Sequence, residues 1–154
     1  MADRCAEGGV LLAEAWMTPF SARYGEVLER ARCGDIGDVV AVDGSFRFTI
    51  GPEASDNYRW DSDQGGGALL DVGIYCLGAA VDLFGHAPME IVAQQRQRNG
   101  VDESTSALLT WPDGRRAFAT CSFVDDEFQR LAIDGTDGSF TIETEAFTGG
   151  SNDA

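Results

Sequence analysis

The sequence predicts an α+β fold, with a mostly antiparallel, open β-sheet that carries helices on one face. Two observations support this prediction. Helical patterns occupy the first half of the chain, and from residue 89 onward polar and apolar residues alternate in five short segments. A run of helices followed by a run of strands is typical of an α+β domain. The other face of such a sheet is expected to be either solvated or an interface.

The first third of the chain predicts a strand and then a helix. Residues 10–17 form a short apolar run after a glycine pair, which is typical of a buried strand. Residues 21–33 predict an amphipathic helix, and Gly34 stands where helices commonly end. The apolar flank of that helix carries Tyr24, Val27, Leu28 and Ala31.

The middle of the chain predicts a strand, a long loop and a second helix. Residues 38–50 alternate as a half-buried strand does, with an interruption at Gly44. Residues 51–64 have no period, and long loops of this kind are often functional. Residues 68–84 predict the second helix. Its apolar flank carries Leu70, Ile74, Leu77, Val81 and Phe84.

The strands of the last part are separated by strong turn signals. The sequence Trp-Pro-Asp-Gly at 111–114 indicates a hairpin, and 134–138 marks another turn. The expected strands are 89–98, 104–111, 115–124, 128–134 and 139–143.

The charge of the chain argues against nucleic acid and membrane partners. Twenty-six acidic and 11 basic side chains in 154 residues leave a net charge of −15, and every basic residue is arginine. Phosphate binding needs clustered basic residues, and an anionic lipid surface would repel this chain. The acid excess has two interpretations, a solvated surface or adaptation to high salt, and the absence of lysine favours the second.

Residue types and spacing exclude further classes. Without lysine, this chain contains no Walker-type phosphate loop and no lysine Schiff base. The four cysteines form no Cys-x-x-Cys pair, so no metal site is expected. The chain has neither an unbroken apolar stretch of membrane length nor a leader-like start, so we expect a cytoplasmic protein.

The glycine-rich stretch at 65–75 holds the first candidate site. Three glycines precede a helix, and Asp71 and Tyr75 lie four residues apart on one helix face. A carboxylate beside a phenol can tune a proton donor or acceptor. The alternative, a loop-capping aspartate and a core tyrosine, is the more common arrangement for such spacing.

A second candidate lies in the long loop. In Asn57-Tyr58-Arg59-Trp60, an arginine beside aromatic rings can clamp a polyol or an anion. The alternative is a salt bridge between Arg59 and a nearby aspartate, which is the simpler interpretation. His86 is expected at a helix end on the surface, because the chain has no second histidine to join it on a metal.

Four motifs in order carry a resemblance to a known family. They are Glu14-Ala15-Trp16-Met17, the sequence Gly-Asp-Ile-Gly-Asp-Val at 34–39, Asn57-Tyr58-Arg59-Trp60 and the stretch 65–75. Together they resemble the glucose–fructose oxidoreductase and inositol dehydrogenase family (Gfo/Idh/MocA). The likeness is greatest to its dihydrodiol, aldose and xylose dehydrogenase branch and covers nearly the whole chain.

The resemblance implies a domain organisation. Members have an N-terminal Rossmann domain that binds NAD(P) and a C-terminal α+β domain for substrate and oligomerisation. Residues 1–17 are therefore expected to be the final helix turn and strand of a Rossmann domain that is almost wholly absent. Residues 18–154 are expected to form the substrate domain, truncated at its end.

The resemblance also implies roles for individual residues. Tyr75 is expected to take part in proton transfer, and Asp71 to orient it or the substrate hydroxyl. Asn57, Arg59 and Trp60 are expected on the substrate side. Many relatives have histidine at the position of Tyr75. Relatives also usually have an arginine and a histidine where this chain has Pro19 and Ser21, which leaves the substrate open.

The chain lacks the Gly-x-Gly-x-x-Gly fingerprint and the family's Glu-Lys-Pro motif. NADP or NAD is therefore expected to bind mainly to the missing domain. The function expected is part of an oxidoreductase that transfers hydride between a nicotinamide and a carbinol of a sugar or polyol. This chain alone is expected to be inactive and to form a homo-oligomer through the open sheet face. The alternative is a non-catalytic oligomerisation or sugar-binding module.

Overall fold

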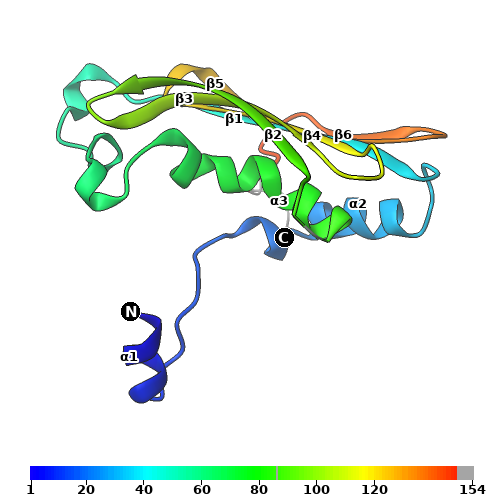
Figure 1. Ribbon diagram of the computed structural model, residues 1–154, viewed down its shortest axis with the longest axis horizontal. Coiled ribbons are helices and arrows are strands. Elements are labelled where there is room, and N and C mark those ends of the chain that lie inside the picture. Colours follow the sequence, from blue (N-terminus) through cyan, green and yellow to red (C-terminus); the bar gives the residue numbers. More distant parts are fainter. Residues whose placement is uncertain (86, 149–154) are drawn as a thin grey trace.

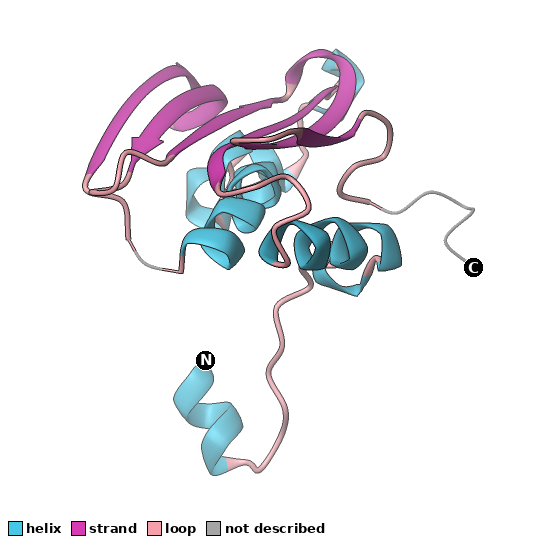
Figure 2. Ribbon diagram, turned by 90° about the vertical axis from the view of Figure 1, so that its right-hand side faces the viewer, coloured by secondary structure: helices cyan, strands magenta, loops and turns pink. Residues whose placement is uncertain are grey.

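The fold is a six-stranded open sheet with helices on one face, seen in a computed structural model that describes residues 1–85 and 87–148. Figures 1 and 2 show α2 and α3 lying on the same side of the sheet. The strand order is β2-β3-β4-β1-β5-β6, and only the β1–β4 pair is parallel. The predicted fold class is confirmed. The position of His86 lies outside the described residues.

The helix predicted at 21–33 and the strand predicted at 38–50 are present. Helix α2 spans Ala22–Arg32, and the Ser21 hydroxyl accepts a hydrogen bond from the backbone N–H of Tyr24 at its start. A short 3₁₀ turn, η1 (Thr18–Phe20), precedes α2. Strand β1 spans Val39–Thr49 at the centre of the sheet, as the alternation predicted.

The expected buried strand at 10–17 is wrong. A short helix, α1 (Ala2–Glu7), is followed by an extended segment that belongs to no sheet. The beginning of the segment lies away from the body of the fold in Figures 1 and 2, and Leu11 is 91% exposed. A strand forms only where a neighbour can pair its N–H and C=O groups, and the described residues provide no such neighbour here.

The predicted loop and second helix are also present, with more local structure than the pattern indicated. The loop contains three 3₁₀ turns, η2 (Pro52–Ala54), η3 (Tyr58–Trp60) and η4 (Ser62–Gln64). The helix begins as a π-helical turn, η5 (Leu69–Gly73), and continues as α3 (Ile74–Phe84). Residues 62–84 have the length and hydropathy of a membrane helix, but half of that window is buried, as in a core helix.

Helix α3 turns its small side chains toward the sheet. Cys76, Ala79 and Ala80 are buried, whereas Leu70 is 68% and Val81 62% exposed. The larger apolar side chains of the flank therefore face mostly away from the sheet, except for the buried Phe84. The cause is close packing, because small side chains let the helix backbone approach β1.

The remaining strands follow the prediction with shifted ends. They are β2 (Glu90–Arg98), β3 (Val101–Thr110), β4 (Arg116–Ser122), β5 (Val124–Gly135) and β6 (Ser139–Ile142). Strand β5 begins four residues earlier than predicted, since Val124 pairs with Thr49 of β1. The charged residues 125–127 mask this part of the strand in the sequence pattern.

Candidate functional site

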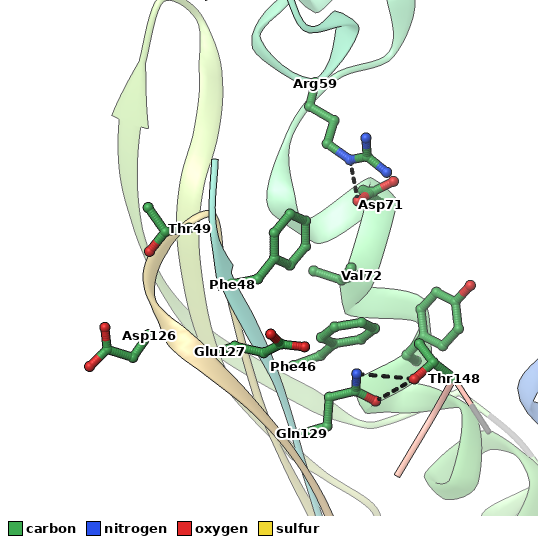
Figure 3. Close-up of a pocket in the computed structure, with 11 residues that line it drawn as sticks. Phe46, Phe48, Thr49, Arg59, Asp71, Val72, Asp126, Glu127, Gln129 and Thr148 are labelled. Atoms are coloured by element: carbon green, nitrogen blue, oxygen red, sulfur yellow. Dashed lines mark hydrogen bonds and ion pairs between the residues drawn. The ribbon is translucent and has the colours of Figure 1, made fainter. Parts of the chain in front are cut away.

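A cavity of about 750 Å³ opens between the end of β1, the first half of β5 and the start of the second helix (Figure 3). Phe46 and Phe48 of β1 form its apolar wall, and η5 and α3 contribute the polar wall. The residues around it are Phe46, Phe48, Thr49, Arg59, Asp71, Val72, Tyr75, Asp126, Glu127, Gln129 and Thr148. The two predicted catalytic residues therefore share one cavity.

Asp71 is held by the arginine of the long loop. The guanidinium Nε of Arg59 donates to Asp71 Oδ2 over 2.7 Å, and both side chains are mostly buried (Figure 3). The Tyr58 hydroxyl contacts the other carboxylate oxygen at 3.4 Å, and the Arg59 guanidinium lies 4.7 Å from the Tyr58 ring centroid. The salt bridge between Arg59 and an aspartate, considered as the alternative from the sequence, is thus present. It joins the two candidate motifs into one site.

The Tyr75 side chain is fixed at its ring and free at its hydroxyl. Its ring meets Phe46 edge-on, with centroids 5.5 Å apart, and contacts Phe147 at 6.2 Å. In the part of the chain that the structure describes, no residue forms a hydrogen bond with its hydroxyl. An aromatic ring held by packing with an unpartnered hydroxyl is available to a ligand.

The Tyr75 phenol is surrounded by negative charge. Burial raises the pKa of Tyr75 above its ordinary value, and the charges of Asp71 and Glu14 raise it further. The Tyr75 hydroxyl is therefore protonated at neutral pH and can donate a hydrogen bond or a proton. To act as a base, the phenol needs a cation nearby that lowers its pKa.

Asp71 and Tyr75 also line a second cavity of about 420 Å³, whose other side is the N-terminal segment. The Trp16 ring lies against the glycine of α3, where a Cβ on Gly78 would approach the ring within 2.2 Å. This contact brings Glu14 to the helix. Asp71 and Tyr75 therefore stand on the wall between two cavities.

Replacing Glu14 with glutamine is expected to lower the pKa of Tyr75. The substitution removes a negative charge that disfavours the phenolate. The measurement is an NMR titration of ¹³C-labelled tyrosine, in which Tyr75 is assigned by its absence from a Tyr75→Phe sample. Glu7→Gln, in the exposed helix α1, is the charge-matched control and is expected to leave the titration unchanged. An unchanged or raised pKa in Glu14→Gln would contradict the assigned contact.

A buried acid from the sheet anchors the turn that carries Asp71. Asp102 of β3 is 8% exposed, and its Oδ2 accepts hydrogen bonds from the Leu69 backbone N–H at 2.9 Å and from the Thr105 hydroxyl. The first N–H groups of a helix have no partner within the helix, so an external acceptor stabilises this end. The sequence carried no signal for this contact, because the two groups are 33 residues apart.

The variant Asp102→Ala is expected to lower the free energy of unfolding by about 1–3 kcal/mol, because it leaves partly buried donors without an acceptor. Urea unfolding followed by circular dichroism measures the change. Asp102→Asn keeps an acceptor oxygen in the same place and is expected to lower the free energy of unfolding by a smaller amount. Equal stability of the alanine variant and the native chain would show that Asp102 does not anchor the turn.

The structure places the other two predicted substrate residues in different roles. The Asn57 side chain accepts a hydrogen bond from the Arg59 backbone N–H at 3.0 Å and so shapes the turn η3. Trp60 is buried, meets Phe123 edge-on at 5.6 Å and lies under the Arg98 guanidinium. Both hold the loop in place, and only Arg59 of the three lines the cavity.

Sequence reasoning missed several residues of the site. Glu127 and Gln129 of β5 line the cavity from the sheet side (Figure 3). Gln129 is buried, and its amide oxygen accepts hydrogen bonds from the Phe147 backbone N–H and the Thr148 hydroxyl. The alternation along β5 could have indicated that 127, 129, 131 and 133 share a face, but not which face.

These residues fit an uncharged polar ligand. Carboxylates dominate the two cavities, and the one arginine among the described residues that line them is already paired with Asp71. They do not fit the pyrophosphate of a dinucleotide, which needs backbone N–H groups at a glycine-rich turn or free cations. Within residues 1–85 and 87–148, no three His, Cys, Asp or Glu side chains form a group that could hold a metal ion.

Comparison with known proteins gives the family. The model of the GFO/IDH/MocA C-terminal domain matches residues 24–141, which is more than half of the chain. The chain belongs to the GFO/IDH/MocA family. The family that the motifs indicated is thereby confirmed.

Curated GFO/IDH/MocA relatives are longer than this chain. It is 35% identical over 141 residues to D-xylose 1-dehydrogenase (NADP(+)) 2 of Haloferax volcanii, covering 88% of this chain and 42% of that protein. It is 38% identical over 143 residues to the dTDP-3,4-didehydro-2,6-dideoxy-alpha-D-glucose 3-reductase of Streptomyces antibioticus. That match covers 91% of this chain and 42% of the reductase. The chain therefore spans less than half the length of these relatives.

Solved structures agree with this placement. The 3-ketoreductase KijD10 from Actinomadura kijaniata, in complex with NADP and TDP-benzene, superposes with a TM-score of 0.81 at 29% identity, over 96% of this chain and 46% of that one. The aldose-aldose oxidoreductase from Caulobacter crescentus, complexed with glycerol, superposes with a TM-score of 0.82 at 26% identity, over 96% of this chain and 45% of that one. The two curated relatives are named as oxidoreductases of sugar-type substrates, and the KijD10 structure holds NADP.

Proposed function

We propose that this chain is the substrate domain of an NAD(P)-dependent oxidoreductase that interconverts a carbinol and a carbonyl of a sugar or polyol. The observation that carries the proposal is the position of Asp71 and Tyr75 on the wall between two cavities. A ligand in the larger cavity can reach the free Tyr75 hydroxyl. The relatives named for D-xylose and for a dTDP-sugar support a reaction at a sugar carbon.

Tyr75 is the proposed proton-transfer residue. Because the pKa of Tyr75 is raised, its hydroxyl carries a proton at neutral pH and can donate it to the oxygen of a carbonyl substrate. In the direction of alcohol oxidation, the same oxygen must accept the proton, which requires a cation to stabilise the phenolate. This chain has no lysine, so the proposed cation comes from outside the chain.

Asp71 and Arg59 are proposed to position the substrate. The ion pair fixes the carboxylate, which still has lone pairs that can accept a hydrogen bond from a substrate hydroxyl. The guanidinium uses its Nε on Asp71 and keeps further N–H donors for the ligand. Asn57 and Trp60 are proposed to act through the loop, since Asn57 binds the Arg59 backbone N–H and Trp60 packs against Phe123.

The cofactor is proposed to bind mainly outside this chain. A nicotinamide dinucleotide, NADP or NAD, supplies the hydride chemistry of such reactions. The described residues contribute the proton-transfer and substrate side of the site. The chain by itself is therefore expected to be inactive.

Complementation tests the proposed function. The purified chain alone is expected to show no aldose-dependent reduction of NADP. The same chain mixed with a dinucleotide-binding domain that supplies the missing lysine is expected to gain turnover, followed by absorbance at 340 nm. Robust turnover by the chain alone would overturn this account, because it would place the whole reaction on residues that lack a cation for Tyr75.

The open sheet face favours a second candidate function, a non-catalytic oligomerisation module. Phe118 of β4 and Phe128 of β5 are 42% and 38% exposed, and the helices cover only the opposite face (Figure 2). We propose that this face pairs two copies of the chain. Sedimentation equilibrium of native chain and Phe118→Asp tests it, since a charged side chain there is expected to dissociate the oligomer. Assembly without any response to cofactor or sugar would favour the module over the enzyme.

Adaptation to high salt is a further part of the proposal. A net charge of −15 destabilises the folded chain through self-repulsion, and salt screens that repulsion. We expect the free energy of unfolding to rise as KCl is added to molar concentration. A cytoplasmic location is also proposed.

A further inference from the structure

One acid in the larger cavity is unpaired among the described residues. Glu127 of β5 lies on the same face of the strand as the cavity-lining Gln129. Figure 3 shows its carboxylate turned toward Phe46, whereas Asp126 points away from the cavity. Among the described residues, none forms a hydrogen bond or an ion pair with Glu127. Its oxygens are therefore available to a ligand.

The position of Glu127 is complementary to that of the reactive pair. Asp71 and Tyr75 belong to the helix wall of the cavity. Figure 3 shows Glu127 extending from the sheet wall opposite Asp71. The rings of Phe46 and Phe48 lie on β1 beside it and offer apolar faces. A ligand held between these walls meets a carboxylate at the end away from the helix and aromatic surface along its length.

The charges around the cavity select the kind of ligand. The carboxylates of Asp71 and Glu127 face it, and the only cation among the described lining residues is the Arg59 guanidinium, which Asp71 neutralises. A free carboxylate accepts two hydrogen bonds and so suits neighbouring hydroxyl groups. The same carboxylate repels a phosphate, pyrophosphate or carboxylate on the ligand.

We propose that Glu127 determines the substrate class of this site. Its carboxylate accepts hydrogen bonds from hydroxyl groups of an uncharged sugar or polyol and excludes sugars that carry an acidic group. This inference rests on the proposed function and narrows it, because sugar phosphates, nucleotide-linked sugars and uronic acids are excluded. Glu127 binds and selects, and the proton transfer remains with Tyr75.

A matched pair of ligands tests the role of Glu127. D-glucose and D-glucuronate differ only at C6, where a hydroxymethyl group is replaced by a carboxylate. Each is titrated into the full 154-residue chain, and binding is followed in two-dimensional NMR spectra at one fixed salt concentration. We expect D-glucose to shift resonances of the cavity residues and D-glucuronate to bind at least about tenfold more weakly.

Two variants complete the test. Glu127→Gln is expected to weaken D-glucose binding several-fold. The dissociation constants of the two ligands are then expected to differ by no more than about twofold. Glu90→Gln removes the same charge at an exposed position on β2. This variant is expected to keep the native difference in affinity between D-glucose and D-glucuronate. Equal binding of both ligands to the native chain, or an unchanged difference in Glu127→Gln, overturns this inference and leaves the proposed function standing. If neither ligand perturbs the cavity, the inference and the proposed function both fail.

Discussion

Replacing Tyr75 with phenylalanine is expected to lower the turnover of the oxidoreductase that contains this chain by about 10²- to 10⁴-fold, the range typical of a lost proton donor. The substitution removes only the hydroxyl, which has no partner among the described residues, so the ring keeps its contacts with Phe46 and Phe147. Steady-state kinetics should show the loss in kcat, with a small change in KM.

Tyr58→Phe is the matched control for this prediction. It removes the other tyrosine hydroxyl near Asp71, at 3.4 Å, without touching the proposed proton path. We expect a change in turnover of less than about tenfold, since Arg59 still holds the carboxylate. If the two variants lose activity equally, Tyr75 has no special role, and the site works through the Asp71 environment as a whole.

Replacing Gly44 with alanine is expected to destabilise the fold by about 3 kcal/mol, at the upper end of the usual effect of overpacking. Gly44 lies in the middle of β1 and faces α3. A Cβ at this position would lie 2.3 Å from the carbonyl oxygen of Cys76 and 2.6 Å from its Cα, so backbone must move. The helix cannot yield locally, because the same stretch carries Tyr75 and is buried on this side.

Urea unfolding measures this change, and the neighbouring residue provides the control. Ser45 follows Gly44 on the opposite face of β1, and Ser45→Ala is expected to change the free energy of unfolding by less than about 0.5 kcal/mol. A Gly44→Ala chain as stable as the native one would mean that α3 does not pack on β1 as described. Loss of sugar binding in the same variant would link the packing to the site.

Most of the secondary structure could be predicted from local patterns. Helix α2, strand β1 and the hairpins of the sheet follow from side-chain periodicity and turn residues, which act over a few residues. The strand expected at 10–17 is absent for a related reason. Its apolar run indicates a preference to be buried, but burial needs a partner that the described chain does not offer.

The candidate site was predicted in part. Asp71 and Tyr75 share a cavity, as their spacing on one helix face indicated. The partner of Asp71 is Arg59, 12 residues earlier, and the sequence had indicated only that some nearby aspartate would pair with it. Glu127 was invisible as a site residue, because a charged residue in an alternating strand is usually a solvated one.

The sequence by itself determined the class of the fold, the two helices, the order of the strands along the chain and the motifs that identify the family. Only the tertiary structure decided which elements meet. The parallel pairing of β1 with β4, the approach of Glu14 to Tyr75 and the Asp102 anchor on Leu69 join residues far apart along the chain. Periodicity indicates which face of an element is apolar. The neighbour of that face depends on how the whole chain packs, because the free energy of burial depends on buried surface and shape and not on distance along the sequence.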